Sequence, residues 1–348
     1  MQGQGGGLDL ILLLDSSGST AFTDLDNLRL TSARYLLDYV QAVGEAQGAA
    51  HRFAAANFNV DTLDEIPWTR LQGDAGRDQL VARSEGGTDF APALEYALRL
   101  RQEDGGADEM AVVLFTDGAP CPSSPCPSGV ALTAYFDELS STIAALEETG
   151  AQIFVVALGD DSTAADWSAL VGATHYRFVD ASTDLAGVYH DFFAELLGLG
   201  TEAVRPLRDG DDTEFEVEPY LEQLVLSVVK SDPSVQVIVT NPFGGTPLPT
   251  RGGGDELHAI YAIPSPAVGR WQVRATGGAA QIWVDRQYAT MVLDAPAAPQ
   301  ALGDTVQVTG QLLRRGVAIV DDPDLRLSVT ATDSAGVTSL FELSRRAG

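Results

Sequence analysis

The fold of this chain is decided near its N-terminus by the stretch Leu8-Asp-Leu-Ile-Leu-Leu-Leu-Asp15-Ser-Ser-Gly-Ser19. Its first part, Leu8–Leu14, is a nearly continuous apolar run, which is typical of a strand buried on both faces of a parallel sheet. Asp15 follows directly, and Ser17 and Ser19 complete an Asp-x-Ser-x-Ser pattern after that strand. Ligands bind at the carboxyl ends of strands in open parallel sheets. The stretch therefore predicts an α/β domain with an oxygen-rich ligand site.

Strand-like and helix-like segments alternate over residues 8–197. The expected strands are Leu8–Leu14, Phe53–Phe58, Val60–Ile66 (at an edge), Met110–Phe115, Ile153–Leu158 and Tyr176–Val179. The expected helices are Leu25–Val43, Phe90–Leu100, Leu132–Glu148, Ala164–Val171 and Leu185–Leu197. This alternation predicts a doubly wound α/β fold, in which helices cover both faces of a mostly parallel sheet.

Beyond the last of these helices the pattern changes to short alternating segments separated by glycine-rich turns. Residues 200–214 are polar and contain Pro206, so we interpret them as a linker. Residues 215–293 then predict an antiparallel β-sandwich of the immunoglobulin or fibronectin kind. Residues 294–348 contain three more strand patterns and are interpreted as a second β-sandwich module, which is either incomplete or joined by its strands to the preceding domain. The glycine-rich residues 1–7 are expected to be flexible.

The charge balance excludes several classes of function. The 348 residues include 49 acidic and 21 basic side chains, which gives a net charge of −28. Such a surface argues against binding to nucleic acid or anionic lipid and favours cation binding. No apolar run approaches the about 20 residues of a membrane span, so no direct membrane insertion is expected in this segment. Met1 is followed by no signal-peptide pattern, so the chain is either cytoplasmic or has lost a targeting segment.

Two further segments add oxygen donors at the same edge of the predicted sheet. Gly86-Gly-Thr88-Asp precedes one expected helix, and Phe115-Thr-Asp117-Gly ends one expected strand. An isolated Asp-x-Ser-x-Ser pattern is more often a serine-rich turn that caps the next helix. The three segments together instead favour a metal site. Carboxylate and hydroxyl oxygens suit a hard divalent cation such as Mg²⁺ or Mn²⁺ better than they suit zinc.

This constellation, in this order and at these separations, resembles the metal-ion-dependent adhesion site of the von Willebrand factor type A (vWA) domain. The resemblance covers the predicted domain of residues 8–199 and implies a six-stranded, mostly parallel, Rossmann-like sheet. It implies that the hydroxyls are ligands and that the two carboxylates act directly or through bound water. The implied cofactor is Mg²⁺, with Mn²⁺ or Ca²⁺ as alternatives. The implied metal residues are Asp15, Ser17, Ser19, Thr88 and Asp117.

The β-rich half carries a second resemblance. Its segment Tyr261–Gly277 contains Pro-x-x-Gly-x-Trp, which is similar to β-sandwich domains that follow vWA domains in hemicentin-like, chloride channel regulator-like and bacterial surface proteins. No protease domain precedes the vWA-like region here, so no protease activity is implied. We expect Trp271 and Trp283 to be core residues. The acidic cluster Asp321–Asp324 is interpreted as a solvated turn in preference to a weak Ca²⁺ site.

The chain has two cysteines, Cys121 and Cys126, which follow the second carboxylate of the motif. We favour a disulfide that closes a tight loop on the rim of the metal site, and with it an oxidising compartment. The alternatives are two reduced thiols or half of a zinc site, for which no further cysteine exists.

These features favour a binding protein. We expect a vWA domain on β-sandwich spacers that captures a partner's carboxylate through the metal, in a secreted or surface-anchored protein. The loops Ala21–Leu25, Asn59–Leu63 and Ala119–Gly129 would set specificity. No catalysis is expected, because no histidine lies in the three motif loops. The alternative is a cytoplasmic assembly or regulatory factor that works with a ring-forming ATPase.

Overall fold

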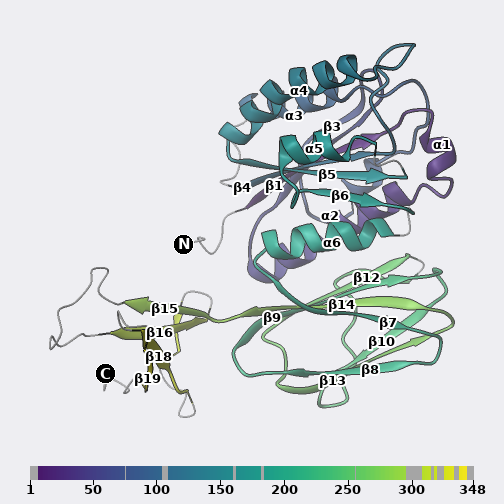
Figure 1. Cartoon of the computed structure of the whole chain (residues 1–348). Coiled ribbons are helices and arrows are strands. Elements are labelled where there is room, and N and C mark those ends of the chain that lie inside the picture. The colour runs from purple at the N-terminus through teal and green to yellow at the C-terminus, as the bar shows by residue number, and fades with distance from the viewer. Residues whose placement is uncertain are drawn as a thin grey trace, which may run out of the picture.

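The computed structural model describes residues 7–74, 76–103, 109–159, 162–181, 184–254, 256–294, 308–314, 317–319, 325–332 and 337–342. Of the predicted flexible segment 1–7, only Gly7 belongs to this part, and the predicted acidic turn Asp321–Asp324 lies outside it. Figure 1 shows an α/β part, which we call the head (β1 to α6), above a two-sheet part, which we call the sandwich (β7 to β14).

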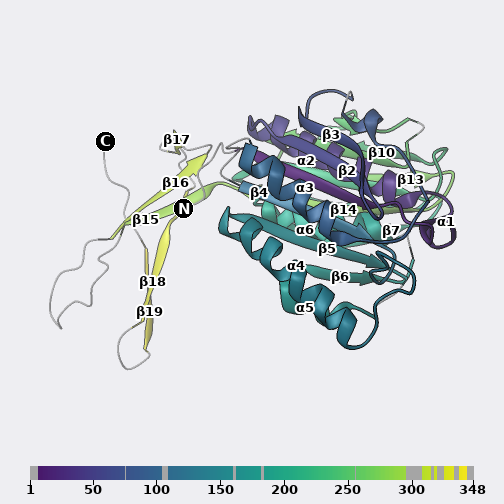
Figure 2. The same cartoon turned by 90° about the horizontal axis from the view of Figure 1, so that it is seen from above.

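A six-stranded sheet forms the centre of the head, with the strand order β3-β2-β1-β4-β5-β6 (Figure 2). The strands are β1 (Leu8–Asp15), β2 (Arg52–Phe58), β3 (Thr62–Arg70), β4 (Glu109–Thr116), β5 (Ala151–Leu158) and β6 (Tyr176–Val179). All neighbours are parallel except β3, which pairs antiparallel with β2 at one edge. The predicted six-stranded, mostly parallel sheet is confirmed.

Helices cover both faces of this sheet, and each face has a hydrophobic core of its own. One face is covered by α3 (Phe90–Glu103), α4 (Val130–Glu148) and α5 (Ala164–Val171), and the other by α2 (Leu28–Gln47) and α6 (Leu185–Leu196) (Figure 2). Two shorter elements are α1 (Thr20–Thr23) and a 3-10 turn, η1 (Arg77–Gln79). In Figure 1, α1 lies at the edge to which β5 and β6 point.

The helix expected from Leu25 begins three residues later, at Leu28. The cause is the buried carboxylate of Asp24, which accepts hydrogen bonds from the backbone amides of Leu28 at 2.7 Å and Arg29 at 3.1 Å. The Arg29 guanidinium also pairs with this carboxylate at 2.8 Å. Because the first amides of a helix lack intrahelical acceptors, the carboxylate fixes where the helix starts. Leu25 stays outside the helix and is 76% exposed.

Two antiparallel sheets form the sandwich and enclose one core. Their orders are β11-β12-β9-β14-β7 and β10-β13-β8. The strands are β7 (Gly200–Leu207), β8 (Asp212–Val217), β9 (Leu221–Lys230), β10 (Gln236–Thr240), β11 (Arg251–Gly252), β12 (His258–Pro264), β13 (Gly269–Thr276) and β14 (Ala280–Tyr288). Trp271 and Trp283 are buried, as predicted. The Trp271 indole N–H donates to the Ala267 carbonyl at 2.8 Å.

The interpretation of residues 200–214 as a linker is wrong, because they contain β7 and the start of β8. β7 pairs with β14, and β8 pairs with β13. Both are edge strands of antiparallel sheets, in which apolar and polar side chains alternate along the strand. Their sequences therefore lack the continuous apolar run of a strand that is buried on both faces. Pro206 is compatible with such a position, since an edge strand can tolerate a missing N–H donor.

Five short strands follow the sandwich. They are β15 (Thr290–Asp294), β16 (Thr309–Arg314), β17 (Val317–Ala318), β18 (Ser328–Thr332) and β19 (Thr338–Glu342). The first three form one antiparallel sheet, and the last two form a separate pair. Apolar side chains such as Leu340 and Phe341 are exposed here. The described strands of this region therefore form no buried core comparable to that of the sandwich.

The sandwich packs directly against the head, beneath α2 and α6 (Figure 1). Val225, Ile260 and Ala262 of the sandwich belong to the same hydrophobic cluster as the side chains of α2 and α6. The head and the sandwich thus share a core at this interface.

Asp285 of β14 is the centre of a buried polar cluster at this interface. Its Oδ2 accepts a hydrogen bond from the Tyr39 hydroxyl at 3.1 Å and lies 2.9 Å from His190 Nε2. Its Oδ1 accepts one from the Thr201 hydroxyl at 2.8 Å. Burial lowers the pKa of His190, but the carboxylates of Asp191 and Asp285 outweigh this effect and raise it above its ordinary value. His190 and Asp285 therefore form a buried histidine–carboxylate pair, in which the carboxylate favours the protonated imidazole.

Asp38 of α2 is the centre of a second cluster at the same interface. Its Oδ2 lies 2.7 Å from His258 Nε2 of the sandwich and 2.7 Å from Arg77 Nη1 of the head. Arg77 also reaches Glu256 of the sandwich at 3.4 Å. The interface thus combines shared apolar packing with two sets of charged contacts.

Replacing Gly44 with alanine is expected to destabilise the protein by about 1–3 kcal/mol, because the added methyl overpacks the core. The Cβ of the new alanine would lie 2.2 Å from Cδ2 of His51. His51 cannot move away freely, because its Nδ1 accepts a hydrogen bond from the Leu8 amide at 2.8 Å. Gly187→Ala is the matched control, since its Cβ meets Trp283 only at 3.4 Å. There, helix propensity predicts a gain of up to about 1 kcal/mol. Urea unfolding of both variants measures the difference, and equal effects would contradict the clash.

Candidate metal centre

The two motif carboxylates come together because β1 and β4 are adjacent parallel strands that end at the same edge. Asp15 is the last residue of β1, and Asp117 follows the last residue of β4, Thr116. The Thr116 hydroxyl donates to Asp15 Oδ2 at 2.8 Å, and the Ser17 amide donates to Asp15 Oδ1 at 2.8 Å. These bonds fix the orientation of the Asp15 carboxylate, which is fully buried.

Three hydroxyls converge on the carboxylate of Asp117. Ser17 Oγ and Ser19 Oγ donate to its Oδ1 at 3.3 Å and 2.9 Å. The Thr23 hydroxyl donates to its Oδ2. The hydroxyl oxygens of Ser17 and Ser19 lie 2.9 Å apart. The loop after β1 and the loop after β4 therefore form one oxygen cluster.

Main-chain contacts connect Thr88 to this cluster. The Gly18 amide donates to the Gly86 carbonyl at 3.0 Å, which joins the serine-rich loop to the loop that carries Thr88. On its other side, Thr88 pairs with Cys121 through two backbone hydrogen bonds. Thr88 is buried. The structure thus joins Ser17, Ser19 and Asp117 by side-chain hydrogen bonds, links Asp15 to them through the Ser17 amide, and places Thr88 through the backbone.

The electrostatics of this cluster fit a divalent cation. Burial raises the pKa of Asp15, and the nearby Asp117 carboxylate raises it further, to about 6. Two carboxylates at close range are stabilised by a positive charge between or beside them. All the donor groups are oxygens, which matches the preference of Mg²⁺, Mn²⁺ and Ca²⁺. Within the described ranges, no cluster of three or more histidine, cysteine, aspartate or glutamate side chains is placed to hold a metal.

Sequence reasoning missed two residues of this cluster, Thr23 and Thr116. Thr116 belongs to the quoted Phe-Thr-Asp-Gly segment, so its place beside Asp15 could have been inferred from the parallel register of β1 and β4. Thr23 gave no comparable signal. It reaches Asp117 because the short helix α1 turns back, with the amides of Phe22 and Thr23 donating to the Ser19 carbonyl at 2.8 Å and 3.2 Å.

Each histidine lies away from the oxygen cluster. His51 binds the amide of Leu8, at the opposite end of β1 from Asp15. His190 and His258 belong to the interface with the sandwich. His175 precedes β6, at the opposite end of that strand from the metal-centre edge. The cluster therefore contains no imidazole group that could act as a base.

The structure joins Cys121 and Cys126 in a disulfide, with their Cα atoms 4.4 Å apart. Cys126 is exposed, and Cys121 is half-buried. The bridged loop follows the second carboxylate, Asp117, and lies on the rim of the oxygen cluster.

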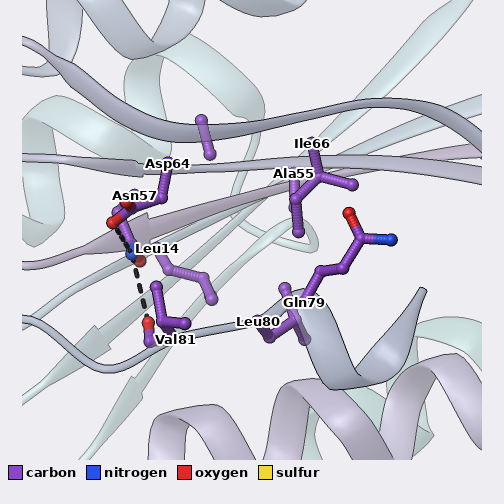
Figure 3. A pocket seen from close by; sticks show the side chains of 9 residues that line it. Leu14, Ala55, Asn57, Asp64, Ile66, Gln79, Leu80 and Val81 are labelled. Carbon is purple, nitrogen blue, oxygen red and sulfur yellow. Dashed lines mark hydrogen bonds between the residues drawn. The ribbon is translucent and has the colours of Figure 1, made fainter. Parts of the chain in front are cut away.

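A small pocket beside β2 and β3 lies outside the cluster (Figure 3). Its polar groups are already paired, since the Asn57 side-chain amide donates to Asp64 at 3.0 Å and to the Val81 carbonyl at 3.1 Å. The rest of its lining is largely apolar, including Leu14, Ile66 and Leu80. This pocket adds no donor to the metal centre.

The chain matches the von Willebrand factor type A domain over residues 9–194, which is more than half of its length. The chain belongs to the von Willebrand factor type A family. The vWA domain therefore coincides with the head, and the oxygen cluster lies within the matched residues. No curated protein matches this chain. Within the described part of the vWA domain and the strands after it, no helix is long and apolar enough to cross a membrane.

Several solved structures are similar to this vWA protein. A von Willebrand factor type A structure from Catenulispora acidiphila is 14% identical, with 88% of this chain and 66% of that chain covered and a TM-score of 0.42. The pilus adhesin SpaC from Lactobacillus rhamnosus GG is 9% identical, with 98% and 57% covered and a TM-score of 0.46. Proximal thread matrix protein 1 from the mussel byssus, with a zinc-occupied adhesion-site motif, is 16% identical, with 59% and 50% covered and a TM-score of 0.43. The chain thus spans about two thirds or less of each of these relatives.

Proposed function

We propose that this vWA protein is a metal-dependent protein-binding module. Asp15, Ser17, Ser19, Thr88 and Asp117 would hold Mg²⁺, or Mn²⁺ or Ca²⁺ in its place. A bound divalent cation supplies a positive charge that attracts a carboxylate of a protein or peptide partner. The observation that supports this most strongly is the convergence of the Ser17, Ser19 and Thr23 hydroxyls on Asp117, beside the buried Asp15 carboxylate.

The surface beside the metal centre supports a partner with an apolar group next to its carboxylate. Phe22 and Leu25 flank Thr23, which bonds to Asp117, and they are 83% and 76% exposed. Large apolar side chains exposed at a binding rim commonly contribute to recognition. The net charge of −28 repels an acidic partner, but salt screens this repulsion over distances longer than about 8 Å. The cation therefore attracts the partner's carboxylate only at short range.

We propose a binding role without catalysis. Activation of water by a metal needs a base and a positioned electrophile. The position of all four histidines away from the metal centre supports this view. We further propose that the protein works outside the cytoplasm, where a disulfide such as Cys121–Cys126 persists. The β-sandwich would then hold the vWA domain away from a surface.

The test combines calorimetry with a peptide-binding assay on the full chain. Titration with Mg²⁺ is expected to show saturable binding at one site. Arrayed peptides with an aspartate or glutamate beside an aromatic residue should then bind in Mg²⁺ and dissociate in EDTA, whereas their asparagine or glutamine counterparts should not bind. The absence of Mg²⁺ binding, or peptide binding that EDTA leaves unchanged, would contradict the proposal.

A further inference from the structure

The disulfide loop and the metal centre are joined at one point, Thr88. The Thr88 amide donates to the Cys121 carbonyl at 3.1 Å, and the Cys121 amide donates to the Thr88 carbonyl at 2.7 Å. This is an isolated antiparallel bridge, outside any regular sheet. The backbone of a predicted hydroxyl ligand is thus paired directly with the backbone of a bridged cysteine.

The two segments approach each other very closely at this bridge. A Cβ on Gly87 would lie 2.3 Å from the Cys121 carbonyl oxygen, so only glycine fits beside it. A displacement of the Cys121 peptide therefore has to move the Gly87-Thr88 backbone or break the two hydrogen bonds. Because backbone groups that lose their partner in a buried place are costly, the pairing holds Thr88 in position.

The loop that carries Thr88 is also held by hydrogen bonds at the residues on either side of Thr88, and these bonds do not involve the disulfide. The Gly18 amide donates to the Gly86 carbonyl at 3.0 Å, and the Asp89 amide donates to the Asn59 carbonyl at 2.6 Å. Thr88 lies between these fixed points and the cysteine loop. If the cysteine loop loosens, Thr88 loses one of its supports while the residues on either side of it keep theirs.

We propose that the Cys121–Cys126 disulfide is a positioning device for Thr88, and that its reduction weakens cation binding at the metal centre. This inference rests on the proposed function, since it assumes that the metal centre binds a cation. A closed loop restricts the conformations open to Cys121, and the open loop does not. The hydroxyl of Thr88 is then less well placed, although both carboxylates remain where β1 and β4 put them.

The chemistry requires only a dithiol reductant. A thiolate of the reductant attacks the sulfur of Cys126, which is an exposed residue, and forms a mixed disulfide, and Cys121 leaves as a thiolate that takes up a proton. The second thiol of the reductant then closes the reductant's own disulfide and releases Cys126 as a thiol. Two electrons and two protons pass from the dithiol to the protein, and the metal centre itself is not oxidised or reduced.

The experiment compares oxidised protein, protein reduced with dithiothreitol, and the Cys121→Ser/Cys126→Ser double variant. Calorimetry with Mg²⁺ is expected to show an affinity that is about threefold to tenfold lower without the disulfide, the loss that corresponds to about one hydrogen bond. Amide hydrogen exchange on the same metal-free samples provides a second readout. The amides of Thr88 and Cys121 should lose protection on reduction, while the Gly18 amide, bonded to Gly86, should keep it as an internal control.

The outcomes separate this inference from the function on which it rests. Equal Mg²⁺ affinity in oxidised and reduced protein would overturn the inference and leave the binding function standing. A lower affinity with unchanged protection at Thr88 would also overturn it, because the disulfide would then act by another route. No Mg²⁺ binding by the oxidised protein would instead remove the proposed function, and this inference with it.

Discussion

Replacing Asp117 with alanine is expected to lower the affinity for Mg²⁺ by about 100-fold or more, because it removes one of the two charges that face the cation. It also removes the acceptor of three hydroxyls, those of Ser17, Ser19 and Thr23. Two candidate hydroxyl ligands would then lose the group that orients them. Calorimetric titration of the variant with Mg²⁺ measures the loss.

A matched control separates this local effect from a general change in charge. Asp137→Ala removes the same side chain from the exposed surface of α4 and should leave Mg²⁺ affinity unchanged. Urea unfolding without metal shows whether the Asp117 variant remains folded. If Asp117→Ala remains folded and binds Mg²⁺ as the unmodified chain does, the cation lies elsewhere and the assignment of the metal centre is wrong.

Replacing Asp285 with alanine is expected to destabilise the protein by about 3–5 kcal/mol, the usual cost of removing one partner of a buried charged pair, because Asp285 pairs with His190 in the buried interface. His190 would lose the buried carboxylate that pairs with it and helps to raise its pKa. The Tyr39 and Thr201 hydroxyls would lose their acceptor as well. Urea or thermal unfolding measures the change.

Two further variants define this effect. Asp285→Asn keeps an acceptor oxygen but not the charge, so its destabilisation should be intermediate. Asp212→Ala breaks the ion pair with Arg274 at 2.9 Å on the exposed face of the sandwich, where such pairs contribute at most about 1 kcal/mol. A loss at Asp285 no larger than that at Asp212 would mean that the buried cluster contributes little to the packing of the sandwich against the head.

Most of the vWA sheet could be predicted from the sequence because its central strands are buried on both faces. β1 and β4 are nearly continuous apolar runs of strand length, and such runs are typical of the central strands of a parallel sheet. β7 and β8 were misinterpreted because edge strands have a different composition. Apolar and polar side chains alternate along these two strands, and β7 contains Pro206. Their sequences therefore resemble a linker until their partners β14 and β13 are known.

The metal centre could be predicted in outline for a similar reason. Parallel strands end at a common edge, so a motif after β1 and a carboxylate after β4 had to lie close together. Thr23 could not be found in this way, because its contact with Asp117 depends on the turn of a four-residue helix. The pairing of Thr88 with Cys121 likewise depends on how two loops fold, and loops follow no periodic pattern.

The interface between the vWA domain and the sandwich gave no signal in the sequence. His190, His258 and Asp285 appear there as scattered polar residues in different segments. Their partners come from the other part of the molecule, so only the folded arrangement reveals the pairs. The role of His190 and His258 in joining the two parts could not be inferred from the sequence.

The shared core beneath α2 and α6 has a mechanical consequence. Force applied to a partner at the metal-centre edge and resisted from the strands beyond β14 would pass across this interface, and not only through the peptide link at Leu199 and Gly200. Closely packed protein interiors have low compressibility and transmit strain. We therefore expect the vWA domain and the sandwich to bear tension as one rigid unit. The two parts should stay together up to a threshold force and then separate from each other in a single step.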